Sequence, residues 1–382
     1  MFRLLRFYSP IALLHLYVAV RLLPDLQPES TLALAALSVW LLASTALIPF
    51  AFRMQRTRAP RLSHALAWTG LLAMGMFSSL FVLTLLRDIA LAGGYALSWF
   101  FAIAGPVEVF RSWSALAVPL MAGFFTAIGF INARRRASVR SVNIPIANLP
   151  AALHGFTIAQ ISDIHIGTTI KGRHLNAIVD AVNDLDADMV AITGDLVDGS
   201  VAELSRHTEC LSRLSARHGA FFVTGNHEYY SGVRSWVAEI RRLGLRVLMN
   251  EHVVLQHKGA GVVVAGVTDY NAGSFDPSQR SDPAAAIAGA PADAGVNVLL
   301  AHQPRSAFAA RTAGYDLQLS GHTHGGQFLP WNFFVRLQQP FTAGLHRLGK
   351  LWIYVSRGTG YWGPPKRLGA PSEITHLTLV PA

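Results

Sequence analysis

The sequence predicts a chain of two parts: an all-α transmembrane region, and after it an α/β fold in which two packed mixed β-sheets are flanked by helices. Hydrophobic residues make up 52% of the 382 residues and charged residues only 14%, and the apolar excess lies almost wholly before residue 133. Beyond that point, apolar runs first alternate with helical patterns and later follow one another as strands, which is typical of a layered α/β fold. We therefore expect a transmembrane region over residues 1–133, a linker and edge strand over 134–155, and an α/β domain over 156–382.

The N-terminal region contains stretches that are apolar and close to the roughly 20 residues that a helix needs to cross a bilayer. They run approximately over residues 8–23, 31–52, 65–86 and 113–131. Lipid offers no partner to backbone amides, so such stretches must be helical. No small-residue cleavage site follows the first stretch, and we interpret all of them as permanent anchors in the inner membrane.

The positions of the arginines predict the topology. Basic clusters precede the first stretch, follow the second and follow the fourth, so four spans place all three clusters on one side, which the positive-inside rule makes cytoplasmic. The α/β domain would then be cytoplasmic as well. Residues 89–105 leave an alternative open: as a fifth span they would move this domain to the other face, whereas the charge pattern favours an interfacial or re-entrant piece. The formal net charge of +10 is explained by these arginines, so no nucleic-acid partner is expected.

The α/β part begins with a proline-bounded extended piece and continues with alternating elements. Period-2 and continuous apolar runs predict strands over residues 156–161, 189–193, 221–224, 253–256, 262–267, 296–301, 317–319, 351–355 and 374–379. Helical spacing of apolar residues predicts helices over 173–185, 201–214 and 236–243. The single cysteine, Cys210, excludes an intramolecular disulfide.

Residue types that bind metal ions follow several of these predicted strands. The polar endings are Ser162-Asp163-Ile164-His165, Gly194-Asp195, Gly225-Asn226-His227-Glu228, His302-Gln303 and Gly321-His322-Thr323-His324. Ligands in open α/β sheets gather at the carboxyl ends of strands, so these endings can converge on one crevice. Imidazole, carboxylate and amide groups without a thiolate suit Mn²⁺, Fe, Zn²⁺ or Co²⁺ better than Mg²⁺.

From about Phe156 to the C-terminus, these blocks resemble the calcineurin-like metallophosphoesterase superfamily, especially its bacterial membrane-associated branch. The resemblance implies a catalytic domain with two divalent ions, Mn²⁺ being favoured and Fe or Zn²⁺ the alternatives. One ion would be held by Asp163, His165, Asp195 and His324. The other would be held by Asp195, Asn226, His302 and His322, so that Asp195 is shared. His252 and His257 are rivals to His302, which its place after the run Val298-Leu299-Leu300 favours.

The reaction that the resemblance implies is hydrolysis of a phosphoester or pyrophosphate. Two ions roughly 3.5–4 Å apart stabilise the attacking and leaving oxygens, and a water between them loses a proton near neutral pH and attacks phosphorus. His227 is the expected proton donor or phosphate-stabilising group. Asp198 and Glu228 are expected to support the ligands or cap the backbone. The loop from Gly358 to Arg367 either holds a phosphate through Lys366 or Arg367 or forms a structural turn.

The membrane anchor and the family branch suggest a phosphorylated substrate that is lipid-linked, and they leave protein partners unknown. Two other functions remain as alternatives. The membrane region could be a sensor or transporter with a regulatory phosphoesterase domain, but an inactive domain would be free to lose ligands, and the set is complete. A nuclease or protein phosphatase is the second alternative; no basic and aromatic stripe outside the membrane region supports nucleic-acid binding.

Overall fold

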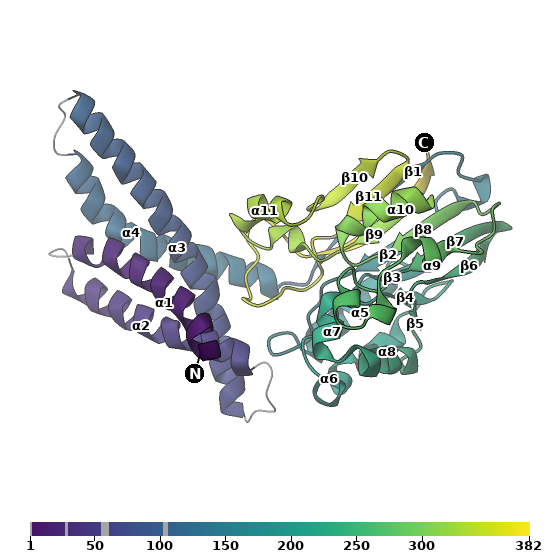
Figure 1. Ribbon diagram of the computed structural model, residues 1–382, viewed down its shortest axis with the longest axis horizontal. Coiled ribbons are helices and arrows are strands. Elements are labelled where there is room, and N and C mark those ends of the chain that lie inside the picture. The colour runs from purple at the N-terminus through teal and green to yellow at the C-terminus, as the bar shows by residue number, and fades with distance from the viewer. Residues whose placement is uncertain (1, 27–29, 55–60, 102–105) are drawn as a thin grey trace. The chain divides into compact units, whose positions relative to one another are not determined.

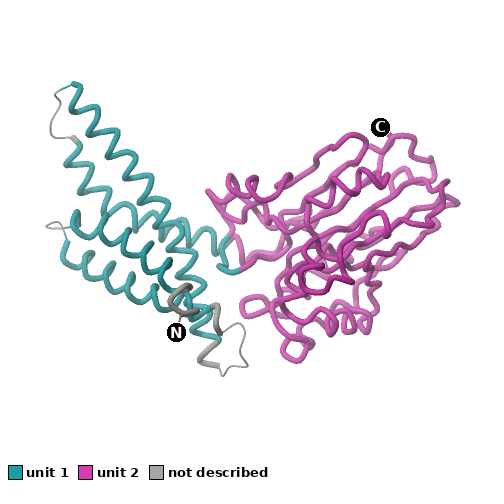
Figure 2. The backbone as a smooth tube through the Cα atoms, in the orientation of Figure 1, with its two compact units in different colours: residues 1–131, 363–366 teal, residues 132–362, 367–382 magenta. Residues whose placement is uncertain are grey.

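The computed structural model describes residues 2–26, 30–54, 61–101 and 106–382 (Figure 1). These residues form two compact units, drawn in two colours in Figure 2. The first unit contains residues 1–131 together with 363–366, and the second contains residues 132–362 together with 367–382. A short loop near the C-terminus therefore belongs to the N-terminal unit.

The first unit is all-helical, as the sequence predicts. Its four helices are each long and apolar enough to cross a membrane, namely α1 (Phe2–Leu22), α2 (Thr31–Met54), α3 (Arg61–Phe101) and α4 (Pro106–Arg134). A 3₁₀ turn, η1 (Pro24–Leu26), follows α1. The basic cluster that follows the second apolar stretch includes Arg56 and Arg58, and these two residues lie outside the described part of the chain.

Helix α3 differs from the expectation for residues 89–105. Residues 89–101 continue α3 without a break, so they form no separate interfacial or re-entrant piece, and residues 102–105 lie outside the described part. No proline interrupts α3, and its paired glycines, Gly93 and Gly94, are accommodated within the helix. With 41 residues and a rise of about 1.5 Å per residue, α3 is about 60 Å long, roughly twice the thickness of a hydrocarbon core.

Two buried polar side chains inside the first unit, Arg87 and His15, have hydrogen-bond partners on other helices. The buried guanidinium of Arg87 donates to Ser114 Oγ at 2.8 Å and to the carbonyl oxygens of Arg21 and Arg111 at 3.0 and 2.9 Å, and it also pairs with Asp25. His15 contacts Ser44 Oγ through Nε2 at 2.9 Å, which links α1 to α2. These contacts give both groups a structural role, because a buried polar group without a partner is costly.

The second unit contains two mixed six-stranded sheets, which confirms the predicted fold class. The first sheet has the order β1-β12-β2-β3-β4-β5, formed by Ser138–Ile146, Glu373–Pro381, Thr157–Ile161, Met189–Ile192, Ala220–Phe222 and Arg246–Val247. The second has the order β10-β11-β9-β8-β7-β6, formed by Gly344–Leu348, Leu351–Val355, Leu317–Ser320, Val296–Leu300, Ala260–Gly266 and Glu251–His257. Strands β2 to β5 are parallel, and so are β7, β8, β9 and β11.

The core of this unit lies between the sheets and on their outer faces. Strand residues alternate between these environments: Ile158 belongs to the cluster shared by both sheets, whereas Ile161 packs with the helices on the outer face of the first sheet. Those helices are α5 (Gly172–Asn183), α6 (Val201–Thr208) and α8 (Val233–Arg242). Two shorter helices, α9 (Pro283–Ile287) and α10 (Ala307–Ala313), cover the outer face of the second sheet. The packing aligns the carboxyl ends of both parallel sets.

Candidate metal centre

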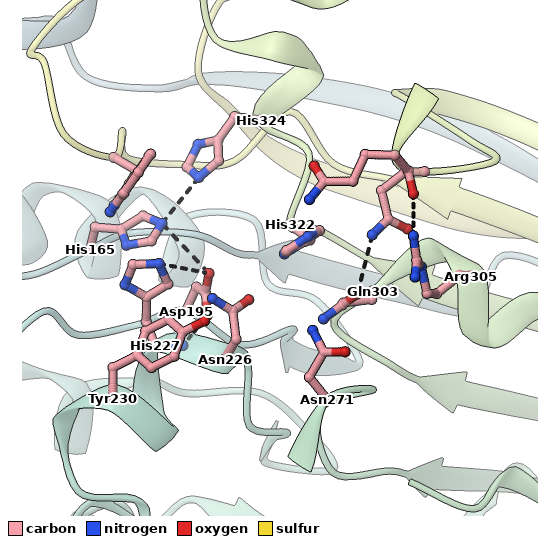
Figure 3. A pocket seen from close by; sticks show the side chains of 13 residues that line it. His165, Asp195, Asn226, His227, Tyr230, Asn271, Gln303, Arg305, His322 and His324 are labelled. Carbon is pink, nitrogen blue, oxygen red and sulfur yellow. Dashed lines mark hydrogen bonds and ion pairs between the residues drawn. The ribbon is translucent and has the colours of Figure 1, made fainter. Parts of the chain in front are cut away.

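The candidate ligands follow the carboxyl ends of strands from both sheets. Asp163 and His165 follow β2, Asp195 follows β3, and Asn226 follows β4 as the first residue of helix α7 (Asn226–Ser231). His302 follows β8. His322 and His324 follow β9, and His324 begins the 3₁₀ turn η7 (His324–Gly326). The structure brings these seven side chains and His227 together at one edge of the sandwich, where several of them point into a common cavity (Figure 3).

The backbone at these strand ends is unusual. Ten described non-glycine residues have a positive φ, and five of them are candidate ligands: Asp163, His165, Asp195, His322 and His324, with φ between 51° and 70°. Residues with side chains adopt this region rarely, and it persists where the surrounding structure holds it. The concentration of such residues at one place indicates that side-chain direction there is fixed at a cost in backbone energy.

The ligand atoms form two neighbouring clusters. In the first, His165 Nε2 lies 3.0 Å from His324 Nε2, and His324 Nε2 lies 3.5 Å from Asp163 Oδ1. In the second, His302 Nε2 lies 3.1 Å from Asp195 Oδ2 and 3.2 Å from His322 Nδ1. Asp195 connects the clusters.

Asp195 is placed to be shared. Its Oδ2 is 3.1 Å from His302 Nε2 in the second cluster and 3.8 Å from His165 Nε2 in the first. Its other oxygen, Oδ1, accepts a hydrogen bond of 2.9 Å from the backbone N–H of His227, which fixes the plane of the carboxylate. One carboxylate oxygen therefore faces both clusters.

These residues fit divalent cations. Nitrogen ligands lie about 2.0–2.1 Å from a metal such as Zn²⁺, so two ligands at right angles are about 3 Å apart, which is the spacing of the facing imidazoles. Asn226 Oδ1 is buried and accepts no hydrogen bond from the described residues, so it lacks the partner that a buried acceptor needs. Burial raises the pKa of Asp163, and its carboxylate requires a compensating positive charge.

The electrostatic environment keeps two histidines neutral, which is the form that binds metal. Burial and then the neighbouring charge of His302 lower the pKa of His322 to about 3. Burial, His165 and the guanidinium of Arg367 hold the pKa of His324 well below its usual value. Burial opposes protonation of His302, but Asp195 outweighs it and raises the pKa of His302 well above the ordinary range. The negative charge of Asp195, which stabilises protonated His302 here, is the charge that a bound cation would neutralise.

Two glycines are required by close approach of the backbone to the ligands. A Cβ atom on Gly225 would lie 2.2 Å from Asp195 Oδ1, and one on Gly321 would lie 2.1 Å from Asp163 Oδ2. Both distances are far below van der Waals contact, so a side chain at either position would displace a candidate ligand.

Carboxylates behind the ligands hold the strand-end loops, as expected for Asp198 and Glu228. Glu228 accepts hydrogen bonds from the backbone N–H groups of Gly225, Asp195 and Leu196 at 2.7, 3.0 and 2.8 Å. Asp198 Oδ1 accepts from His165 Nδ1 at 3.2 Å and also contacts His227 Nδ1. Fixing Nδ1 in this way leaves His165 Nε2 for a metal.

The Gly358–Arg367 loop forms a structural turn. Arg367 is fully buried and donates to the carbonyl oxygens of His324, Arg357 and Ala370 at 3.0, 2.7 and 3.2 Å, and its Nη2 lies 3.1 Å from His324 Nδ1. Lys366 belongs to the helical unit, where its ammonium donates to the carbonyl of Gly75 and to Ser79 Oγ at 2.8 and 2.5 Å. Both cations are occupied by protein acceptors, which opposes the reading of this loop as a phosphate holder.

His227 lies beside the ligand clusters. Burial disfavours its charged form, but Asp195 and Asp198 outweigh burial and raise the pKa of His227 to about 9. Its ring packs against Tyr230 and Trp362 with centroid distances of 5.3 and 5.8 Å. A protonated imidazole at neutral pH suits a proton donor or an anion-stabilising group.

The rivals to His302 lie elsewhere. His252 Nδ1 contacts the carbonyl of Ala286 at 2.9 Å, and His257 Nδ1 contacts His218 Nε2 at 3.1 Å. Neither belongs to a potential metal-binding group of the described residues.

A pocket of about 370 Å³ opens over the clusters. It is lined by His165, Asp195, Asn226, His227, Tyr230, Asn271, Gln303, Arg305, His322, His324, Gln338, Gln339 and Trp362. The sequence predicts no role for four of the amide side chains, Asn271, Gln303, Gln338 and Gln339, or for Arg305. The only sequence signal for Arg305 is its position three residues after His302.

Comparison with known proteins places this geometry in context. The family model described as calcineurin-like phosphoesterase matches residues 156–326. A transmembrane protein with metallophosphoesterase domain from Danio rerio is 37% identical over 259 residues, which cover 66% of this chain and 59% of that protein. Uncharacterized metallophosphoesterases from Campylobacter jejuni and Helicobacter pylori are 35% and 37% identical, covering 69% of this chain in both cases and 69% and 70% of those proteins. The chain thus spans less than two thirds of the vertebrate relative's length and more than two thirds of the bacterial ones.

Proposed function

Because this chain belongs to the calcineurin-like metallophosphoesterase family, we propose that it is a membrane-anchored phosphohydrolase that uses two divalent cations to cleave a phosphoester or pyrophosphate bond. The observation that carries the proposal is the pair of ligand clusters joined by Asp195. The catalytic part is proposed to extend over residues 156–382.

In this proposal, each cation has four protein ligands. Asp163, His165, Asp195 and His324 hold one ion, and Asp195, Asn226, His302 and His322 hold the other. Mn²⁺ suits this mixture of imidazole, carboxylate and amide ligands, and Fe or Zn²⁺ are the alternatives.

The cations, when bound, supply positive charge to the phosphoryl oxygens and lower the pKa of a water. The side chains of the chain itself position the remaining groups. Asp198 holds Nδ1 of His227, so Nε2 is the ring nitrogen left for the substrate. The imidazolium of His227 stabilises the phosphoryl group and gives its proton to the leaving oxygen as the bond from phosphorus to that oxygen breaks.

The experiment that tests this proposal uses full-length protein in detergent, supplied with Mn²⁺ and bis(4-nitrophenyl) phosphate. Asp195→Asn is expected to lower kcat/KM about 10³-fold, because it weakens the only carboxylate shared by both clusters. Asp180→Asn is the matched control, since Asp180 is exposed and pairs only with Arg213 at the surface of α5. Equal turnover by wild type and Asp195→Asn would refute the proposal.

The substrate is proposed to be lipid-linked. An exposed apolar segment comprises helix α11 (Trp331–Phe334) and the 3₁₀ turn η8 (Val335–Leu337). Phe333, Phe334 and Leu337 are 68%, 53% and 85% exposed, and the next two residues, Gln338 and Gln339, line the pocket. Apolar and aromatic side chains exposed together are typical of a surface that meets lipid.

A comparison of substrates tests the lipid proposal. Phe333→Ser combined with Phe334→Ser is expected to reduce hydrolysis of a phospholipid in mixed micelles several-fold and to leave hydrolysis of bis(4-nitrophenyl) phosphate unchanged. A strong preference of the wild-type protein for soluble nucleotides over lipid substrates would contradict the proposal.

The phosphoesterase part is proposed to face the cytoplasm from a multi-pass anchor in the inner membrane. Support comes from the four apolar helices and from the arginines at the start of α1, between the apolar parts of α2 and α3, and at the end of α4. Green fluorescent protein fused to the C-terminus is expected to fluoresce in cells. Activity of a C-terminal alkaline phosphatase fusion, which requires export, would contradict this orientation.

A further inference from the structure

The pocket extends beyond the candidate ligands to a second wall of different chemistry. This wall, which we call the amide wall, consists of Asn271, Gln303, Arg305, Gln338 and Gln339. Figure 3 labels the first three of them. Asp195 is the only carboxylate among the described residues that line the pocket. The amide wall therefore carries hydrogen-bonding amides and one positive charge, and none of its five residues is an acid.

Arg305 is held in place but is not neutralised. Its Nη2 donates to the carbonyl oxygen of Gln338, and the guanidinium carbon lies 5.2 Å from the ring centre of Tyr270. Its Nε is buried and has no hydrogen-bond partner, and no carboxylate of the described residues lies within 4.0 Å of the guanidinium. Arg87 and Arg357 differ in this respect, because Arg87 pairs with Asp25 and Arg357 pairs with Glu373.

A buried acid that contacts the amide wall, Asp269, already has hydrogen-bond partners. Asp269 is buried, and its carboxylate accepts hydrogen bonds from Gln303 Nε2 at 3.1 Å and from the backbone N–H of Asn271 at 2.8 Å. Gln339 Nε2 in turn donates to Gln303 Oε1 at 3.1 Å, while Gln339 Oε1 is buried without a partner. The amides are thus fixed from behind, and Asp269 is not in contact with Arg305.

Arg305 and the candidate ligand His322 line the same pocket. A half-buried guanidinium with unused donors, fixed against an aromatic ring and facing a cavity, is a site for a planar or tetrahedral oxyanion, because charge-assisted bonds to carboxylate or phosphate are its strongest contacts.

We propose that Arg305 binds a second anionic group of the substrate, next to the phosphoryl group that reacts at the metal centre. The inference rests on the proposed function and adds a specificity determinant to it. The substrate class is a phosphodiester or diphosphate diester with a further phosphate or carboxylate close to the reacting phosphorus. In hydrolysis, a water oxygen bonds to that phosphorus, the bond from phosphorus to the leaving oxygen breaks, and the leaving group keeps the electron pair and receives a proton.

The test compares two probes with the same aromatic arms on full-length, detergent-solubilised protein supplied with Mn²⁺. Bis(4-nitrophenyl) phosphate has one anionic phosphorus, and P1,P2-bis(4-nitrophenyl) diphosphate has two. Arg305→Gln is expected to raise KM for the diphosphate about 10- to 100-fold and to leave the kinetics on the monophosphate within about two-fold, since a charged hydrogen bond contributes about 1.5–3 kcal/mol. Arg305→Lys is expected to recover part of the loss.

The matched control is Arg311→Gln, an exposed arginine on α10 whose replacement should change neither probe. Equal losses on both probes in Arg305→Gln, or no loss on either, would overturn the proposal. If the wild-type protein hydrolyses neither probe, the proposed function fails. The second-anion site is then judged by calorimetric binding of the dimethyl ester of methylenediphosphonate, which wild type should bind at least ten-fold more tightly than Arg305→Gln does, and equal affinities would reject it.

Discussion

Replacing Gly321 with alanine tests whether the close approach of the Gly321 backbone to Asp163 is needed to position the ligands of the candidate metal centre. The added Cβ would lie 2.1 Å from Asp163 Oδ2 and 2.0 Å from Ser162 Oγ, whereas ordinary contact begins at 3.4 Å. The backbone or the carboxylate must therefore move by about 1 Å. Asp163 has little room to move, because it is fully buried and its oxygens accept from the backbone N–H of His322 at 2.9 and 3.1 Å.

The expected magnitude follows from that displacement. A shift of about 1 Å in a catalytic group costs about 10²-fold in rate, which corresponds to about 2.7 kcal/mol of transition-state stabilisation. Gly321→Ala is therefore expected to lower kcat/KM for bis(4-nitrophenyl) phosphate about 100-fold and to reduce the metal content of the purified protein. The assay is steady-state hydrolysis with Mn²⁺, accompanied by elemental analysis and thermal unfolding in detergent.

Two controls separate this effect from a general loss of folding. Gly219→Ala places a Cβ in open space at a φ of +84°, so it should lower stability slightly and leave kcat/KM unchanged. Ser162→Ala combined with Gly321→Ala removes the overlap with the hydroxyl but not with the carboxylate, and should stay defective. Full activity and full metal content in Gly321→Ala would refute the reasoning.

Three further results are expected. Asp195 and Asp198 together raise the pKa of His227 to about 9, and Asp198→Asn removes one of these two charges. Activity that needs protonated His227 is lost as the pH rises through that pKa, so the alkaline loss of activity in Asp198→Asn should occur at a lower pH than in wild type. An unchanged pH–rate profile would contradict this role. Arg367→Met removes a donor from the carbonyl of His324 and leaves the carbonyls of Arg357 and Ala370 without one. The free energy of unfolding should therefore fall by about 3 kcal/mol or more, which a thermal melt within one degree of wild type would rule out. Chelation of metals with EDTA should abolish hydrolysis and lower the melting temperature, and Mn²⁺ should restore both, whereas unaffected turnover would exclude a metal-dependent reaction.

The sequence predicted the α/β architecture and the grouping of the site residues because both depend on local patterns. Apolar runs mark the strands, and polar residues such as Asp195 and Asn226 follow directly where strands end. Parallel strands bring their carboxyl ends to one edge, so residues far apart in sequence meet there. For this reason His302, which follows the carboxyl end of β8, lies in the candidate metal centre. His252 and His257 lie within β6 and are not part of it.

Other features depend on contacts that sequence spacing does not encode. The continuation of α3 to Phe101 was missed, because hydropathy indicates apolar stretches but not whether two of them form one uninterrupted helix. The role of Arg367 was left open, because its partners at His324, Arg357 and Ala370 are set by how the loop folds back. Arg305 and the amide wall come from separate loops without periodicity, so only the folded chain places them in one pocket.

The content of bound metal tests the central claim most directly. Full-length protein, purified with Mn²⁺ and freed of loosely bound metal, should contain two metal ions per chain by elemental analysis, because Asp195 joins two clusters of ligands. Asp195→Asn should contain markedly fewer. A folded wild-type protein without bound metal, or an Asp195→Asn protein that retains two ions per chain, would contradict the account.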